Sequence, residues 1–144
     1  SSKQVNSFRT INTRTYLSKY FYGDLWMSEG IKSVNFSIEN LENLKQYLVS
    51  KNIKMLVVIF PWAFELADKT PRENYLNYIL PKLDEKKINY ISAYEYFLNL
   101  KSDVYSTISD NYVYNDIHFN KQGYKILSDI IWEEISNSII KKSK

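Results

Sequence analysis

Met55-Leu56-Val57-Val58-Ile59-Phe60, followed by Pro61, is a continuous apolar run of strand length in a chain of 144 residues. The run is rich in β-branched residues, which favour strands, and it has no polar face. A strand that alternates apolar and polar residues is buried on one side, whereas a run without alternation is typical of a strand buried on both sides. The run therefore predicts a central strand of a parallel sheet.

Helical patterns flank this run on both sides. Apolar residues recur at spacings of three and four over 29–51, which predicts an amphipathic helix, and Asn52 is suited to the left-handed position that ends a helix. Further elements are expected in this order: a loop over 61–71, a helix over 72–86 that Pro81 kinks or splits, a strand over 88–91, a short helix over 93–100, a loop over 101–115 and a helix over 121–140.

The N-terminal part gives weaker signals. Residues 4–22 suggest one or two short helices, and the consecutive large side chains Leu25, Trp26 and Met27 are expected to be buried. The alternation of helices with strands predicts an α/β fold. Two strands do not make a sheet of ordinary size, so either the N-terminal part conceals more strands or the chain is the C-terminal part of a larger domain. The first residue, Ser1 rather than methionine, fits the second expectation.

Composition narrows the class of protein. The net charge of +3 comes in part from lysines at the C-terminus, and no basic face is interleaved with aromatic residues, so no nucleic-acid partner is expected. No apolar run approaches the roughly 18 residues of a transmembrane helix. The absence of cysteine excludes disulfides and thiolate metal sites but fits several compartments, of which we favour an extracytoplasmic one. The oligomeric state is left open.

A second stretch contains candidate catalytic residues. His118 is the single histidine of the chain, and Asp116 lies two residues before it. A carboxylate beside an imidazole can orient the ring and stabilise the imidazolium, which makes the pair a candidate general base. A surface or capping histidine is the structural alternative. One histidine without cysteine offers no ligand cluster, so no metal is expected, and no glycine-rich phosphate loop follows Phe60, so no cofactor is expected either.

The block Asp116-Ile117-His118-Phe119-Asn120-x-x-Gly123, followed by an amphipathic helix, resembles the last block of the SGNH/GDSL hydrolases. Val57-Val58-Ile59-Phe60-Pro61-Trp62 is similar to the strand ending in Pro-Trp found in a bacterial branch of that family. The resemblance covers roughly residues 25–135. It implies a three-layer, flavodoxin-like α/β fold with a parallel sheet, with residues 1–144 as a single domain that forms the C-terminal portion of it.

The resemblance also implies roles for residues. His118 would be the general base, Asp116 its orienting carboxylate, Asn120 a helix cap and Gly123 a close-packing position. Trp62 would follow the carboxyl end of its strand, where ligands bind in open α/β sheets, and either lines a substrate pocket or is a core aromatic. Glu65 and Asp68, in the same loop, are expected to be solvated.

The sequence departs from the family in lacking the nucleophile block. No Gly-Asp-Ser string is present, and Gly23-Asp24-Leu25 has leucine in the serine position. Ser28, Ser106 and Ser109 are therefore not assigned as the nucleophile, which is expected outside this chain. The implied activity is hydrolysis or transfer of an O-acyl group, with O-acetyl esters on carbohydrate as the favoured substrate. The alternative is an inactive SGNH-like domain that binds a glycan or a protein.

Overall fold

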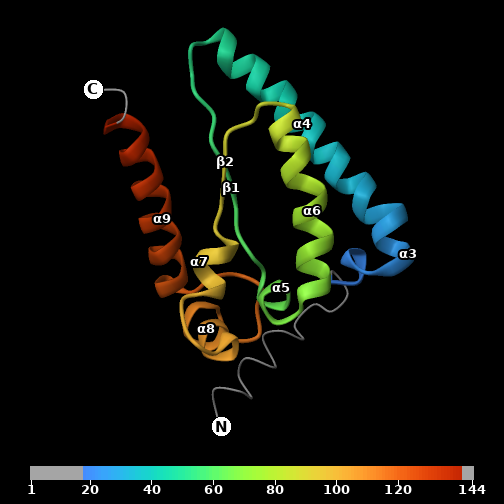
Figure 1. The fold of residues 1–144 in the computed structure, drawn as a ribbon, viewed down its shortest axis with the longest axis vertical. Coiled ribbons are helices and arrows are strands. Elements are labelled where there is room, and N and C mark those ends of the chain that lie inside the picture. The colour runs from blue at the N-terminus through green and yellow to red at the C-terminus, as the bar shows by residue number, and fades with distance from the viewer. Residues whose placement is uncertain (1–17, 141–144) are drawn as a thin grey trace. The chain divides into compact units, whose positions relative to one another are not determined.

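The computed structural model describes residues 18–140, with side chains as far as residue 137 (Figure 1). Helices dominate the described residues, and the two strands pair in a small parallel sheet, which confirms an α/β class. The elements are η1 (Lys19–Phe21, a 3-10 turn), α3 (Gly23–Leu25), η2 (Trp26–Gly30, a π-helical turn), α4 (Ile31–Ser50), β1 (Val57–Ile59), α5 (Ala63–Ala67), α6 (Lys69–Glu85), β2 (Tyr90–Ser92), α7 (Tyr94–Leu98), α8 (Val104–Asn111) and α9 (Lys121–Ile140).

The chain divides into two compact units. The described part of unit 1 consists of residues 58–67 and 91–140, and that of unit 2 of residues 18–57 and 68–90. Each strand of the sheet crosses the boundary, because β1 begins in unit 2 and ends in unit 1 and β2 does the same.

Unit 2 contains two helices that end in the same way. The residue after the last turn of each helix, Asn52 for α4 and Lys87 for α6, has a left-handed backbone with φ of 57° and 52°. The next residue then donates its N–H to a carbonyl in the last turn: Ile53 to Leu48 at 2.9 Å, and Ile88 to Leu83 at 2.9 Å. Such Schellman endings satisfy carbonyls that the helix leaves open and turn the chain toward the following strand. The prediction for Asn52 is confirmed.

The strand β1 is shorter and less buried than the apolar run predicts. Ile59 is buried and Val57 and Val58 are half-buried, whereas Leu56 and Phe60 are 37% and 40% exposed. The expectation of a strand buried on both sides is therefore wrong for this run as a whole. Among the described residues β1 pairs with β2 alone, and a strand with one neighbour has less cover than a central one.

Four further expectations need correction. The segment 101–115, expected as a loop, contains the helix α8. Asp103 stabilises the start of this helix by accepting the N–H groups of Tyr105 and Ser106. The loop expected over 61–71 contains α5 and the start of α6. Pro81 does not split α6, which continues to Glu85, and the alternative that it kinks the helix stays a prediction. Of Leu25, Trp26 and Met27, only Trp26 is buried, because a helical backbone turns consecutive side chains to different faces.

Unit 1 packs its core around α8 and α9. The buried core residues include Phe97, Ile108, Tyr112, Phe119, Leu127 and Ile130. The helix α9 has the bounds predicted for it, and its apolar face points to this core through Leu127 and Ile130. Residues 4–17, which belong to the segment where short helices were expected, lie outside the described residues. In the part of the chain that the structure describes, no helix is both long and apolar enough to cross a membrane.

Candidate active site

Asp116 and His118 lie in hydrogen-bonding contact. The Nδ1 atom of His118 is 2.6 Å from Oδ1 of Asp116. The same carboxylate oxygen accepts the backbone N–H of Ile117 at 2.6 Å and that of His118 at 3.2 Å. The structure therefore brings together the two residues that the sequence singled out, and three donors converge on one oxygen of the carboxylate.

This arrangement keeps Asp116 ionised. The hydrogen bond from the His118 ring, followed by the hydrogen bond from the His118 backbone, lowers the pKa of Asp116 below its ordinary value. An ionised carboxylate at Nδ1 favours the tautomer that has its proton on that nitrogen. The Nε2 atom is then the basic nitrogen, and with the His118 side chain 62% exposed it is open to a nucleophile or a substrate.

A short hairpin holds the pair. Tyr112 and Phe119 form an antiparallel bridge, and the N–H of Val113 donates to the carbonyl of His118 at 2.9 Å. At the tip, the N–H of Asp116 donates to the carbonyl of Val113 at 3.1 Å, and Asn115 adopts a left-handed backbone with φ of 58°. Asparagine tolerates this conformation better than most residues. The tip therefore places Asp116 and His118 two residues apart on one exposed turn.

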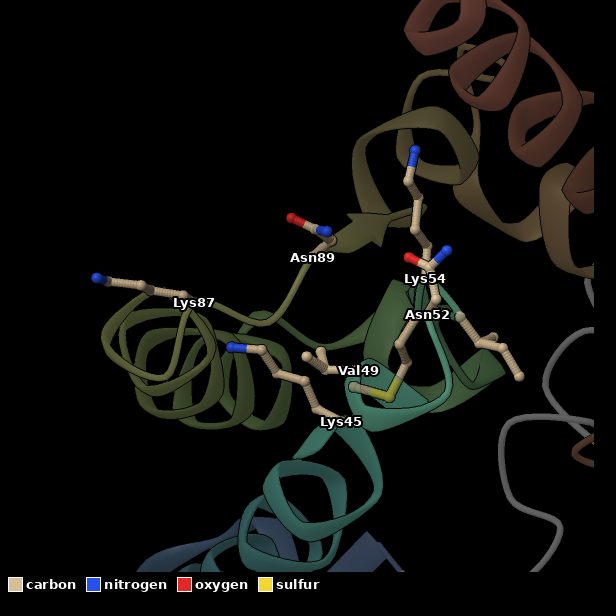
Figure 2. A pocket seen from close by; sticks show the side chains of 8 residues that line it. Lys45, Val49, Asn52, Lys54, Lys87 and Asn89 are labelled. Carbon is tan, nitrogen blue, oxygen red and sulfur yellow. The ribbon is translucent and has the colours of Figure 1, made fainter. Parts of the chain in front are cut away.

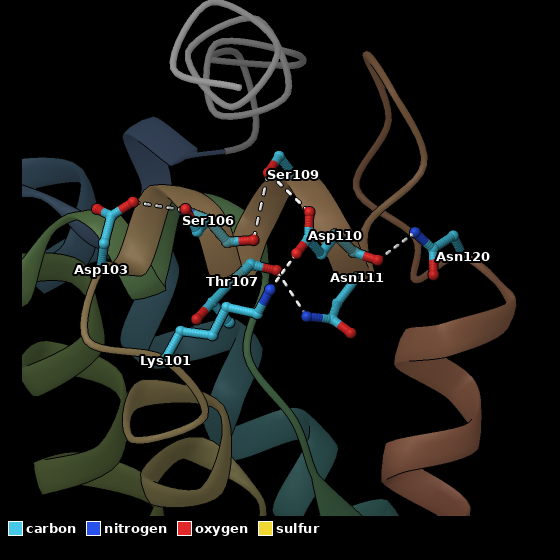
Figure 3. Close-up of polar contacts among 8 residues, drawn as sticks. All are labelled: Lys101, Asp103, Ser106, Thr107, Ser109, Asp110, Asn111 and Asn120. Carbon is cyan, nitrogen blue, oxygen red and sulfur yellow. Dashed lines mark hydrogen bonds and ion pairs between the residues drawn. The ribbon is translucent and has the colours of Figure 1, made fainter. Parts of the chain in front are cut away.

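Asn120 joins the end of the hairpin to α9. Its side-chain oxygen accepts the N–H groups of Gln122 at 2.8 Å and Gly123 at 3.1 Å, which caps the helix as predicted. Its amide nitrogen donates to the carbonyl of Asp110 at 2.8 Å, a contact drawn in Figure 3. Asn120 therefore fixes the start of α9 to the end of α8, two residues after His118.

Gly123 lies where two backbones approach closely. A Cβ atom added at this position would collide with the backbone oxygen of Asn111 and with the ring of Phe119. The close-packing role expected for Gly123 is confirmed. Packing α9 this tightly against the base of the hairpin restricts the position of Phe119, the neighbour of His118.

The base of the hairpin is aromatic and buried. The Phe119 ring lies between several others, with ring centroids 4.7 Å from Phe97, 4.6 Å from Tyr112 and 5.6 Å from Phe60. The Tyr112 hydroxyl donates to the carbonyl of Pro61 at 2.7 Å. Through Phe60 and Pro61 the hairpin is thus anchored to the segment that follows β1.

Trp62 follows in that segment. Its side chain is half-buried and packs edge-on against Phe64, with ring centroids 5.6 Å apart. The connection to His118 that the structure describes is indirect and runs through Pro61, Tyr112 and the bridge to Phe119. The structure thus gives Trp62 a partly buried packing contact, and its role toward a substrate stays a prediction.

Glu65 is not solvated as expected, whereas Asp68 is partly exposed. Glu65 is 3% exposed, and its carboxylate accepts the N–H of Trp62 at 2.8 Å, at the start of α5. Asp68 caps α6 by accepting the N–H of Thr70 at 2.9 Å, and it also accepts the Tyr22 hydroxyl at 2.6 Å. Both carboxylates serve helix N-termini, where negative charge is stabilised.

The serines that the sequence left unassigned are engaged elsewhere. The Ser28 hydroxyl donates to the carbonyl of Asp24 at 2.8 Å, that of Ser109 donates to the carbonyl of Ser106 at 3.2 Å, and that of Ser106 bonds Asp103 (Figure 3). In the described part of the chain, the hydrogen-bonding partner of the His118 ring is Asp116. The described residues also contain no group of three or more acidic, histidine or cysteine side chains suited to a metal ion.

Sequence reasoning missed Tyr112 and the roles of Glu65 and Phe119. Tyr112 is one of 13 tyrosines, and nothing local distinguishes it from the others. Its role depends on Pro61, which is 51 residues away in the chain. The chain matches no protein-family model, no curated protein and no solved structure.

Proposed function

We propose that this chain carries the Asp–His part of a serine esterase or acyltransferase of the SGNH type. The proposed substrate is an O-acyl ester, with an O-acetyl group on a carbohydrate as the favoured case. The observation that carries the proposal is the 2.6 Å contact between Asp116 Oδ1 and His118 Nδ1 on an exposed hairpin. The resemblance of Asp116-Ile117-His118-Phe119-Asn120 to the last family block is the second support.

The proposed chemistry divides the work between the two residues. The Nε2 atom of His118 removes the proton from a serine hydroxyl as the serine oxygen attacks the ester carbonyl, and Asp116 stabilises the resulting imidazolium. The imidazolium then gives its proton to the leaving alcohol as the carbon–oxygen ester bond breaks. Water or a sugar hydroxyl next loses a proton to His118 as its oxygen attacks the acyl-serine carbonyl. The bond from that carbonyl carbon to the serine oxygen then breaks, and the imidazolium returns its proton to the serine, which releases the acid or the new ester.

The serine is expected outside these 144 residues, because their sequence contains no Gly-Asp-Ser block. The three-layer fold of the family would likewise need more strands than β1 and β2. Sheets usually have four to six strands, whereas β1 and β2 pair only with each other among the described residues. The exposure of Leu56 and Phe60 beside β1 is the feature that additional strands would remove.

Substitution of the pair tests the proposal in the intact gene product. We expect His118→Ala to abolish hydrolysis of a small aryl acetate ester, and Asp116→Asn to lower kcat by about 10⁴-fold, as loss of the orienting carboxylate does in serine proteases. Asp129→Asn is the matched control, because it removes an exposed carboxylate that pairs with Lys125 on α9. Unchanged turnover by His118→Ala would exclude the proposed role.

The contact itself is testable without turnover. Long-range ¹H–¹⁵N NMR of the imidazole reports which ring nitrogen holds the proton. We expect the proton on Nδ1 of His118 at pH values where the ring is neutral. A proton on Nε2 would show that the hydrogen bond to Asp116 is absent in solution.

A second candidate function is a glycan- or protein-binding domain of SGNH type without catalysis. The missing Gly-Asp-Ser block favours it. Labelling of the intact gene product with a serine-reactive fluorophosphonate separates the two candidates. Labelling that is lost in His118→Ala supports the esterase, and a folded protein that is never labelled supports the binding domain.

A further inference from the structure

The peptide group between Pro61 and Trp62 is held at both of its polar atoms by buried side chains. Its carbonyl accepts the Tyr112 hydroxyl at 2.7 Å, and its N–H donates to Oε2 of Glu65 at 2.8 Å. Tyr112 and Glu65 are each 3% exposed. Rotation of this peptide would break both hydrogen bonds where water has little access to replace them, so the peptide is confined to one orientation.

The backbone on the other side of Trp62 is held as well. The Trp62 carbonyl accepts the N–H groups of Glu65 at 3.0 Å and Leu66 at 3.3 Å, which begins α5. Pro61 is fully buried, and its ring fixes its own φ angle. Because both flanking peptides are fixed, the direction in which the Trp62 side chain leaves the backbone is fixed too. All of these residues belong to unit 1.

Capping of α5 explains only part of this arrangement. Glu65 is the third residue of α5, and a glutamate at that position commonly accepts the N–H of the residue that caps the helix. The Tyr112 hydroxyl, however, binds the carbonyl of Pro61, which precedes the cap and is not one of the groups that a helix start leaves open. Tyr112 therefore restrains the peptide before Trp62 from outside the helix.

Trp62 has less cover than the two residues that hold its peptide, because its side chain is half-buried. Close packing on all sides holds a core aromatic, whereas a partly exposed ring depends more on its backbone for orientation. Trp62 also lies three residues after Ile59, the last residue of β1, and ligands bind beyond the carboxyl ends of strands in open α/β sheets. A fixed backbone that carries a partly exposed indole suits a residue that contacts a ligand.

The hollow at the end of α4 lacks this restraint. Figure 2 shows the side chains that line it, and the ammonium groups of Lys45, Lys54 and Lys87 do not converge on one point. All of its lining residues are exposed or half-buried. The segment after β1 differs, because two buried side chains there fix the backbone of a partly exposed one.

We propose that Tyr112 and Glu65 are positioning residues, which hold the Trp62 indole in the orientation in which it contacts the carbohydrate part of the ester. The flat C–H faces of sugar rings match the negative face of an aromatic ring. The inference rests on the proposed function, because the carbohydrate comes from that proposal. It adds that two buried residues outside the Asp–His pair set the affinity for the ligand.

Binding measured in a His118→Ala background of the intact gene product tests this inference without turnover. The probes are acetylated oligosaccharides of xylose, glucose and mannose, followed by isothermal titration calorimetry. We expect Trp62→Ala to weaken binding about tenfold and Tyr112→Phe to weaken it about threefold or more. Tyr124→Phe, the matched control, removes a hydroxyl from an exposed tyrosine and should leave the affinity unchanged. Turnover of an aryl acetate with His118 restored tests the esterase separately, so the two proposals can fail independently.

Two further comparisons separate positioning from stability. Tyr112→Phe combined with Trp62→Ala should bind no more weakly than Trp62→Ala alone, because the hydroxyl acts through the indole. Glu65→Gln keeps an acceptor for the Trp62 N–H and should retain most of the affinity that Glu65→Leu loses, and the Tyr112→Phe cycle decides the outcome if Glu65→Leu does not fold. Additive losses, or unchanged affinity in Tyr112→Phe, would assign both residues to stability alone and overturn the proposal. Failure of every probe to bind, or normal binding by Trp62→Ala, would overturn it as well.

Discussion

Tyr112 connects two segments that are far apart in the sequence. Its buried hydroxyl donates to the carbonyl of Pro61, while its backbone bridges to Phe119 next to His118. Burial, together with the negative charge of Glu65, raises the pKa of Tyr112 well above its ordinary value. The phenol is therefore protonated at neutral pH and acts as a donor there.

Removal of this hydroxyl should destabilise the fold. Tyr112→Phe keeps the ring but leaves the buried Pro61 carbonyl without this donor, and an unsatisfied buried acceptor costs about 1–3 kcal/mol. Urea unfolding measures the difference. Tyr124→Phe is the matched control, because that tyrosine is exposed and its ring contact with Phe119 would be retained. Equal free energies of unfolding for the Tyr112 variant and the unsubstituted protein would contradict the role of the bond.

Residue roles that depend on neighbours in sequence were predictable. The left-handed Asn52 and the capping Asn120 follow from short-range rules about helix ends, and both are confirmed. Glu65 was expected in solvent because charged side chains seldom lie inside a protein. Its burial depends on the packing of unit 1, which no local pattern reveals.

Asn120 connects two helices, because it caps the start of α9 and donates to a carbonyl near the end of α8. Asn120→Ala removes the acceptor for two N–H groups and the donor to Asp110, so we expect a loss of about 2 kcal/mol or more. Asn120→Ser keeps a capping hydroxyl but not the amide donor, and it should lose less. Chemical unfolding of the three proteins tests this order, and an Ala variant as stable as the Ser variant would contradict it.

The cap of α8 predicts a dependence on pH. A hydrogen bond from the Ser106 hydroxyl, helped by backbone N–H groups, lowers the pKa of Asp103 in the folded protein. A lowered folded pKa stabilises the protein above the unfolded value of about 3.9, and this contribution disappears as the pH falls through the folded value.

Comparison with Asp103→Asn isolates that contribution. The unsubstituted protein should be more stable than the variant at pH 7, and the difference should narrow below about pH 4. Urea unfolding at pH 7, 4 and 2.5 measures it. A difference that stays constant over this range would show that the ionised form of Asp103 has no preferred partner in the fold.

Long periodic elements were easier to predict than short ones. The helix α9 has the predicted bounds because its apolar residues recur over 20 positions. The helix α8 has 8 residues of mostly polar composition. This composition concealed two features that favour a helix here, namely the Asp103 cap and the buried Ile108. Short helices depend on capping and tertiary contacts more than on periodicity, which explains why a loop was expected there.

At the scale of the molecule, the class of fold was predictable and the extent of the sheet was not. The apolar run of β1 indicates a strand, but the number of its neighbours depends on residues that the run does not contain. The exposed residues Leu56 and Phe60 show the consequence, because an apolar pattern suited to burial is here only partly covered. The same limit applies to the proposed catalytic pair of Asp116 and His118, because no local pattern in the chain identifies a nucleophile for it.

The sharing of the sheet bears on whether the chain is one domain. Contacts divide it into two units, yet β1 and β2 each place one residue in unit 2 and two in unit 1. Unfolding of either unit would therefore remove part of both strands. We expect both units to unfold in one cooperative transition, as single domains of this size usually do.

Tryptophan fluorescence can follow the two units separately. Trp26 is buried in unit 2 and Trp62 is half-buried in unit 1, while Trp132 is 70% exposed and should report little. Two variants that replace the other tryptophans with phenylalanine would retain only Trp26 or only Trp62. In each variant the fluorescence midpoint in urea should coincide with the far-UV circular dichroism midpoint of the same protein. A Trp26 signal that changes at a different urea concentration from the helical signal would show that unit 2 unfolds on its own, and the single-domain prediction would then be wrong.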